Sequence, residues 1–170
     1  MPQEIELRFA APERDLKRIA RSSALHGFQL GPVATHHLKT VYFDTPELSL
    51  SKGGYALRVR QNGHGFVQTV KGVSSGALAS ERSECECEVD TADPDLSRVP
   101  DEDLRQRLEA LAGDSSIGPV VETEIQRTTR AVKSPLGDEI ELAVDRGEIR
   151  TLGNGHAALP VSEVELEASE

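Results

Sequence analysis

The chain is poor in aromatic residues and has no long apolar segment. Its 170 residues include no tryptophan, 2 tyrosines and 4 phenylalanines. Proteins that bind single-stranded nucleic acids stack the bases on aromatic side chains, so this composition argues against such a platform. No apolar run approaches the ~18 residues of a membrane-spanning helix, and the N-terminus lacks a basic and then apolar signal segment. We therefore expect a cytoplasmic protein that binds no membrane.

Cysteine is equally scarce. Cys85 and Cys87 are the only two, and at this spacing they share one face of an extended segment. A zinc site would need further ligands at suitable spacing, and the adjacent His36 and His37 point to opposite faces of a strand. We expect both cysteines to pack as small apolar side chains.

Positive charge is in deficit. The chain has 19 lysines and arginines against 29 aspartates and glutamates, which gives a net charge of −10. General nucleic-acid binding needs a basic surface, and we expect none here. Basic residues gathered in one interior could still bind a small polyanion. The length suits a single domain over residues 1–170 with a buried core.

What the chain does have is charge at every second position, most clearly at its two ends. Charged side chains alternate with aliphatic ones in Glu4–Arg8 and in Glu163–Glu167. In a strand, alternate side chains share one face, so the aliphatic residues are expected to face a core. Carboxylates at ~4 Å repel each other by on the order of 4 kcal/mol at an effective dielectric of 20. A cation is therefore expected between them.

Basic residues follow the same period in the middle of the chain. Arg58 and Arg60 alternate with aliphatic residues, Lys71 shares a face with Thr69, and Arg127 begins a similar run. A surface strand would mix such charges with serine, threonine and glutamine. The density of arginine and glutamate instead indicates a shared polar interior.

The periodicity predicts a mainly β (α+β) protein with two longer helices. Pro12 suits the first turn of a helix that continues to about Ser23, and a second helix over residues 101–112 ends at Gly113. The Asn62–Gly65 segment predicts a hairpin turn. Strands are expected at residues 3–9, 35–44, 55–61, 66–72, 80–89, 120–132, 138–150 and 160–168. Long antiparallel strands with a few covering helices predict an eight-stranded antiparallel closed β-barrel with a charged interior.

Several motifs together resemble the CYTH domains, also called triphosphate tunnel metalloenzymes. Glu4–Arg8 is similar to the ExExK signature that opens the family. The later motifs follow in family order: Tyr42–Thr45, Leu57–Arg60, Thr69–Lys71, Arg82–Glu84, Arg127, Glu141–Gly147 and Glu163–Glu167. The resemblance covers the whole chain and is closest to the bacterial inorganic triphosphatases. It implies a tunnel that binds triphosphate with Mg²⁺ or Mn²⁺, in a chain without the family's C-terminal helix or a CHAD domain.

The resemblance also implies roles for individual residues. The metal would be held by Glu4, Glu6, Asp145, Glu163 and Glu165. The phosphates would be held by Arg8, Arg58, Arg60, Lys71 and Arg127. The catalytic set would be Glu4, Glu6, Arg8, Lys71, Glu84 and Asp145. Guanidinium groups bind phosphate bidentately and carboxylates suit a hard divalent cation. The implied reaction is hydrolysis of inorganic triphosphate by a metal-activated water that attacks a terminal phosphorus.

Other interpretations stay open. The same fold could serve a class IV adenylyl cyclase, a thiamine- or nucleoside-triphosphatase acting on an organic triphosphate, or a non-catalytic polyphosphate-binding module. The family's lysine is Arg8 here, and the two are not equivalent at a phosphate. Arg58 and Arg60 could simply pair with carboxylates across strands. Asp44–Pro46 is expected to shape a turn and cap the segment that follows. The chain could be a monomer or a homodimer.

Overall fold

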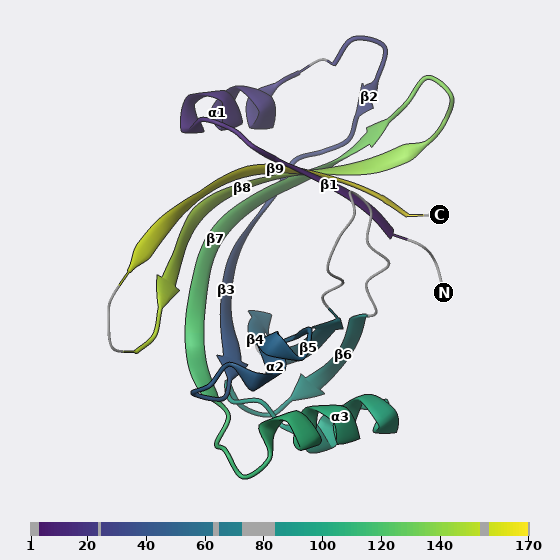
Figure 1. The fold of residues 1–170 in the computed structure, drawn as a ribbon. Coiled ribbons are helices and arrows are strands. Elements are labelled where there is room, and N and C mark those ends of the chain that lie inside the picture. The colour runs from purple at the N-terminus through teal and green to yellow at the C-terminus, as the bar shows by residue number, and fades with distance from the viewer. Residues whose placement is uncertain (1–3, 24, 63–64, 73–83, 154–156, 170) are drawn as a thin grey trace.

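The computed structural model describes residues 4–23, 25–62, 65–72, 84–153 and 157–169. Within them, a 9-stranded antiparallel sheet dominates (Figure 1). Its strands are β1 (Glu4–Ala10), β2 (Gln29–Leu30), β3 (Ala34–Asp44), β4 (Tyr55–Asn62), β5 (Gly65–Gly72), β6 (Glu84–Val89), β7 (Gly118–Lys133), β8 (Glu139–Thr151) and β9 (Ala158–Ser169). The helices are α1 (Glu13–Arg21), α2 (Ser49–Lys52) and α3 (Glu102–Ala112), with a 3-10 turn, η1 (Leu96–Arg98).

The strand order is β1-β9-β8-β7-β3-β4-β5-β6, and β2 adds a short pairing to β7. The sheet is strongly curved, with one concave and one convex face (Figure 1). The first and last strands run side by side, with Glu4 opposite Ser169, so the described ends of the chain lie together. The mainly β prediction is confirmed. Among the described residues no pairing joins β1 to β6, so closure of the barrel stays a prediction.

The predicted elements are found within a few residues of their expected bounds. Helix α1 has acidic residues in its first turn and arginines in its last, which suits the helix dipole. Helix α3 begins where the Asp101 carboxylate accepts from the Leu104 N–H, and ends at Gly113 with a positive φ. The short β2, α2 and η1 were not predicted. Residues 80–83 of one expected strand, and Gly63 and His64 of the expected turn, lie outside the described residues.

Two apolar clusters cover the convex face. One lies under α1, where Leu16 packs with Val132, Leu142, Val144 and Val164 of β7, β8 and β9. The other lies between α2, α3 and the β3–β6 part of the sheet, where Cys85 packs against the core, as expected for a small apolar side chain. Because side chains alternate along a strand, the residues between these apolar positions face the concave side. No helix among the described residues is both long and apolar enough to cross a membrane.

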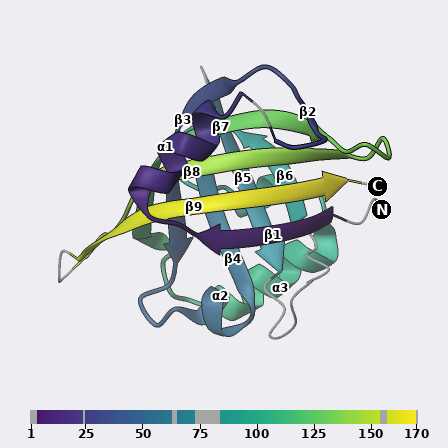
Figure 2. The same cartoon turned by 90° about the horizontal axis from the view of Figure 1, so that it is seen from above.

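One predicted core face is exposed. Ile5, Leu7 and Phe9 of β1 are 46%, 44% and 50% exposed, so the prediction that aliphatic residues of Glu4–Arg8 face a core is wrong. Helix α1 folds back over β8 and β9 and leaves β1 uncovered (Figure 2). In β9 the same expectation holds, because Val164 is buried under α1.

Asp44 caps α2, as its sequence context predicted. Its carboxylate accepts from the backbone N–H groups of Thr45, Leu50 and Ser51 at 2.8, 2.9 and 3.0 Å, and the residue is buried. Asp44→Ala would leave these donors without an acceptor, so the free energy of unfolding should fall by about 2–4 kcal/mol. Urea unfolding measures it, with Glu47→Ala, an exposed neighbour, as the control. A loss no larger than the control's would contradict this capping role.

Gly147 marks a close approach of β8 to β7. A Cβ at this position would lie 2.0 Å from the Glu124 carbonyl oxygen and 2.9 Å from the Ile125 Cα. Gly147→Ala therefore forces the two strands apart and should lower the free energy of unfolding by about 1–3 kcal/mol. Gly118→Ala is the matched control, because nothing lies within 4 Å of its added Cβ. Equal stability of the two variants in thermal unfolding would contradict the prediction.

Candidate active site

The charged faces of β1, β7, β8 and β9 meet on the concave side of the sheet. Glu165 lies at the centre, and it is buried. Its Oε1 lies 2.8 Å from Arg8 Nη2, and its Oε2 lies 2.5 Å from Arg127 Nη2. One carboxylate therefore links an arginine of β1 to an arginine of β7, two strands that are not neighbours in the sheet.

Asp145 holds Arg127 from the neighbouring strand. The two are direct cross-strand partners, and Arg127 donates from Nε to Oδ1 at 2.8 Å and from Nη2 to Oδ2 at 2.5 Å. Burial by itself would lower the pKa of Arg127, but the hydrogen bonds and charges of Asp145 and Glu165 outweigh it and raise that pKa. Arg127 is thus a fixed cation with a defined orientation.

Arg8 lies among three carboxylates. Its Nη2 is 2.6 Å from Glu6 Oε1 and 2.8 Å from Glu165 Oε1, and its Nε is 3.6 Å from Glu163 Oε2. Burial opposes the charge of Arg8, but Glu165 and Glu6 outweigh burial and raise its pKa. A cation was expected between the carboxylates of Glu4–Arg8 and Glu163–Glu167. In this structure Arg8 itself supplies that positive charge. We call Glu6, Arg8, Arg127, Asp145, Glu163 and Glu165 the Arg8–Arg127 network.

A second group of charges lies on β4, β5 and β6. Glu84 accepts from Arg58 Nη2 at 3.2 Å and lies 2.8 Å from Lys71 Nζ through its other oxygen. The alternative in which Arg58 pairs with a carboxylate of another strand is therefore realised. Glu86 instead accepts from the Thr69 hydroxyl at 3.0 Å, and no ion pair joins it to Arg60 in the described part of the chain.

Arg60 lies between the two groups and has no carboxylate within ion-pair distance among the described residues. Its Nε donates to the Thr40 hydroxyl at 3.1 Å. Burial lowers the pKa of Arg60, and the positive charges of Arg58 and Arg127 lower it further. Arg58 Nε is itself buried without a hydrogen-bond partner in the described structure. Arg60 thus lies beside two further positive charges with no ion pair of its own in the described structure, which is the electrostatic condition for binding an anion.

Thr40 is a site residue that the sequence analysis missed. It is 2% exposed and is the cross-strand partner of Arg60. The sequence did contain one signal: Thr40 is two residues from Tyr42 of the Tyr42–Thr45 motif, so the two share one face of a strand. A threonine in a strand is common on either face, so the signal alone was too weak.

The predicted site residues are mostly brought together. The Arg8–Arg127 network contains six of them, Arg58, Lys71 and Glu84 form the second group, and Arg60 lies between the two. The backbone of Glu4 pairs with Ser169 in the sheet, but the Glu4 side chain is outside what the structure describes. Arg82 also lies outside the described residues. The carboxylate oxygens of Glu6, Glu163 and Glu165 suit a hard divalent cation. However, no group of three or more histidine, cysteine, aspartate or glutamate side chains among the described residues is arranged to hold a metal ion.

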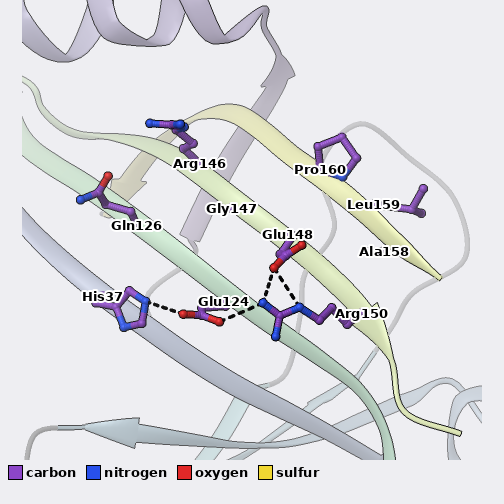
Figure 3. A pocket seen from close by; sticks show the side chains of 10 residues that line it. All are labelled: His37, Glu124, Gln126, Arg146, Gly147, Glu148, Arg150, Ala158, Leu159 and Pro160. Carbon is purple, nitrogen blue, oxygen red and sulfur yellow. Dashed lines mark hydrogen bonds and ion pairs between the residues drawn. The ribbon is translucent and has the colours of Figure 1, made fainter. Parts of the chain in front are cut away.

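A hollow on the convex face is not the favoured site. It is lined by His37, Glu124, Gln126, Arg146, Gly147, Glu148, Arg150, Ala158, Leu159 and Pro160 (Figure 3). Four of its side chains are paired with one another: His37 lies 3.0 Å from Glu124, and Arg150 contacts Glu124 and Glu148. It also lies on the sheet face opposite the Arg8–Arg127 network, because Arg146 pairs with Glu13 of α1.

Comparison with known proteins points to one family. The sequence profile of the CYTH domain matches residues 2–170. A candidate adenylate cyclase from Bacillus halodurans has a similar structure, with a TM-score of 0.57 at 19% identity over 98% of this chain and 80% of that one. A candidate adenylyl cyclase from Hippeastrum, described as having a dominant triphosphatase activity, gives 0.56 at 21% identity over 100% and 80%. A Pyrococcus horikoshii protein gives 0.50 at 21% identity over 97% and 77%. No curated protein sequence matches the chain.

Proposed function

The chain belongs to the CYTH domain family, whose members are triphosphate tunnel enzymes with triphosphatase or adenylyl cyclase activity, and we propose that it hydrolyses inorganic triphosphate. The observation that carries the proposal is the guanidinium of Arg60, which has no carboxylate within ion-pair distance among the described residues and lies near the guanidinium groups of Arg58 and Arg127 on the concave face. A small polyanion with several negative charges matches several cations at once.

Binding would begin at Arg60. Its positive charge has no carboxylate partner among the described residues, so a phosphate oxygen there displaces no ion pair. Arg58 lies two residues away on the same face of β4. Lys71, two residues from the Thr69 that pairs with Arg58, supplies a further point charge from β5. Glu84 holds both of these cations in place, which gives it a positioning role.

Members of the family generally use divalent metals. In this chain Glu6, Glu163 and Glu165 would hold Mg²⁺ or Mn²⁺, with Glu4 and Asp145 completing the predicted set. When bound, such a cation neutralises phosphate charge and makes a water molecule a better nucleophile.

The protein's own contribution is orientation and charge. Arg127, fixed by Asp145 and Glu165, would hold one end of the triphosphate, while Arg58 and Arg60 hold the other. Charge that develops on the phosphate oxygens in the transition state then meets guanidinium groups already in place. No protein nucleophile is required.

A cyclase or an organic triphosphatase is the second candidate. Both need a surface that recognises a base or a ring, and the chain has only 2 tyrosines, 4 phenylalanines and no tryptophan. The dominant triphosphatase activity in the name of the Hippeastrum protein also favours hydrolysis.

Phosphate release tests the proposal. The purified chain is incubated with triphosphate, ATP or thiamine triphosphate, each with Mg²⁺, Mn²⁺ or EDTA. We expect release from triphosphate that needs a divalent cation, at a kcat/KM at least about 100-fold above that for ATP, because the chain has few aromatic side chains to recognise a base. Preferred turnover of ATP or thiamine triphosphate would overturn the substrate assignment. Tight triphosphate binding without any release would indicate the non-catalytic alternative.

A further inference from the structure

The guanidinium of Arg8 occupies the point where three carboxylates converge. Glu6 reaches it along β1, and Glu163 and Glu165 reach it from β9, the neighbouring strand. These are the oxygens that would hold a divalent cation in the proposed function. An arginine of the same chain therefore already provides their positive charge.

Arg8 and a metal ion would compete for these oxygens. A hard divalent cation needs its oxygen ligands at about 2.0–2.6 Å, and it repels a neighbouring guanidinium. Arg8 Nη2 lies 2.8 Å from Glu165 Oε1 and 2.6 Å from Glu6 Oε1. A cation coordinated by these two oxygens would therefore weaken both contacts and repel the guanidinium.

The two arginines at Glu165 differ in their freedom to leave. The Arg8 side chain is 51% exposed and lies on β1, at the end of the described strand order. Arg127 is 25% exposed and is held by both oxygens of Asp145. Arg8 is thus the mobile partner and Arg127 the fixed one, so Oε1 can be released while Oε2 stays bound.

We propose that Arg8 is an internal competitor of the divalent cation and sets its affinity. Without metal, Arg8 neutralises Glu6, Glu163 and Glu165. Metal binding displaces it, and the displaced guanidinium becomes available to a bound polyanion, so metal and polyanion bind with positive coupling. This inference rests on the proposed function for the location of the metal, but its test contains no substrate.

The test is a titration with Mn²⁺ alone, in which the signal of free Mn²⁺ is followed by electron paramagnetic resonance. Arg8→Met is expected to bind Mn²⁺ at least about 10-fold more tightly than the parent protein. This change corresponds to the free energy of one charge-assisted contact that Mn²⁺ no longer has to break. The matched control is Arg146→Met, which removes the same formal charge from the opposite face of the sheet, where Arg146 pairs with Glu13. Its affinity should change by less than about 2-fold, because screening weakens such distant charges. An unchanged affinity in Arg8→Met, or an equal gain in both variants, would overturn the proposal.

Arg8→Lys keeps the test valid if the methionine variant does not fold. A lysine retains the charge but lacks the fork that contacts several carboxylates, so its Mn²⁺ affinity should fall between those of the parent and Arg8→Met. Parent-like affinity in the lysine variant would then count against competition. If Mn²⁺ binding shifts as expected but no phosphate is released from triphosphate, the proposed function fails and the competition stands. Release without any shift would reverse that conclusion.

Discussion

Replacing Arg127 with methionine should lower the free energy of unfolding by about 3–5 kcal/mol, the range for removing one partner of a buried ion pair. Asp145 and Glu165 are 5% and 7% exposed, and both direct their oxygens at Arg127. Methionine resembles the apolar stem of arginine but leaves these carboxylates without their shared cation. The expected cost comes from the desolvated negative charges that remain.

The pH dependence separates this explanation from a simple packing defect. In the variant, folding would bury the Asp145 carboxylate without its cation and would leave Glu165 with Arg8 alone. Carboxylates buried in this way take up protons more readily in the folded than in the unfolded state. Such groups destabilise the fold above the unfolded pKa, and the penalty disappears as they take up protons at lower pH. Urea unfolding at pH 7 and at pH 4.5 measures this effect. The difference in the free energy of unfolding between variant and parent should be smaller at pH 4.5 than at pH 7. Arg14→Met, 85% exposed, serves as the control, and an equal gap at both pH values would contradict the explanation.

The sequence predicted the charged faces because a strand has a strict period of two. Arg127, Asp145 and Glu165 were all expected to face a shared interior, and the structure brings them together on the concave face of the sheet. Which carboxylate holds which arginine depends on strand register, and register is set by pairing between segments far apart in the chain. Arg127 is opposite Asp145, and Arg8 is opposite Glu165. Nothing local to any of these residues encodes that match.

The same reason explains the failure at β1. Its alternating pattern is indistinguishable from that of β9, yet Val164 is buried and Phe9 is exposed. The difference arises from the path of α1, which crosses β8 and β9 (Figure 2). Helix placement depends on the turn at Ala11 and Pro12 and on the apolar cluster around Leu16. The period of two therefore predicts that one face of a strand is apolar, but it does not predict which helix, if any, covers that face.

Arg60 provides the sharpest test of function, because its loss should damage binding without damaging the fold. Arg60→Met removes a guanidinium whose described contact is the hydroxyl of Thr40 and which is repelled by Arg58 and Arg127. The free energy of unfolding should stay the same or rise by up to about 1 kcal/mol, since like-charge repulsion disappears. The dissociation constant for triphosphate should rise by about 10–100-fold, the weight of one charge-assisted contact to phosphate.

Arg58 is the natural comparison for Arg60, because it lies on the same face of β4 but forms an ion pair with Glu84. Arg58→Met breaks the contact with Glu84, so it should weaken triphosphate binding and also lower stability by about 1–2 kcal/mol. Calorimetric titration with triphosphate and urea unfolding of both variants give the two readouts. Arg60→Met with reduced stability and unchanged triphosphate affinity would show that Arg60 supports the fold, and would remove the observation on which the triphosphatase proposal rests.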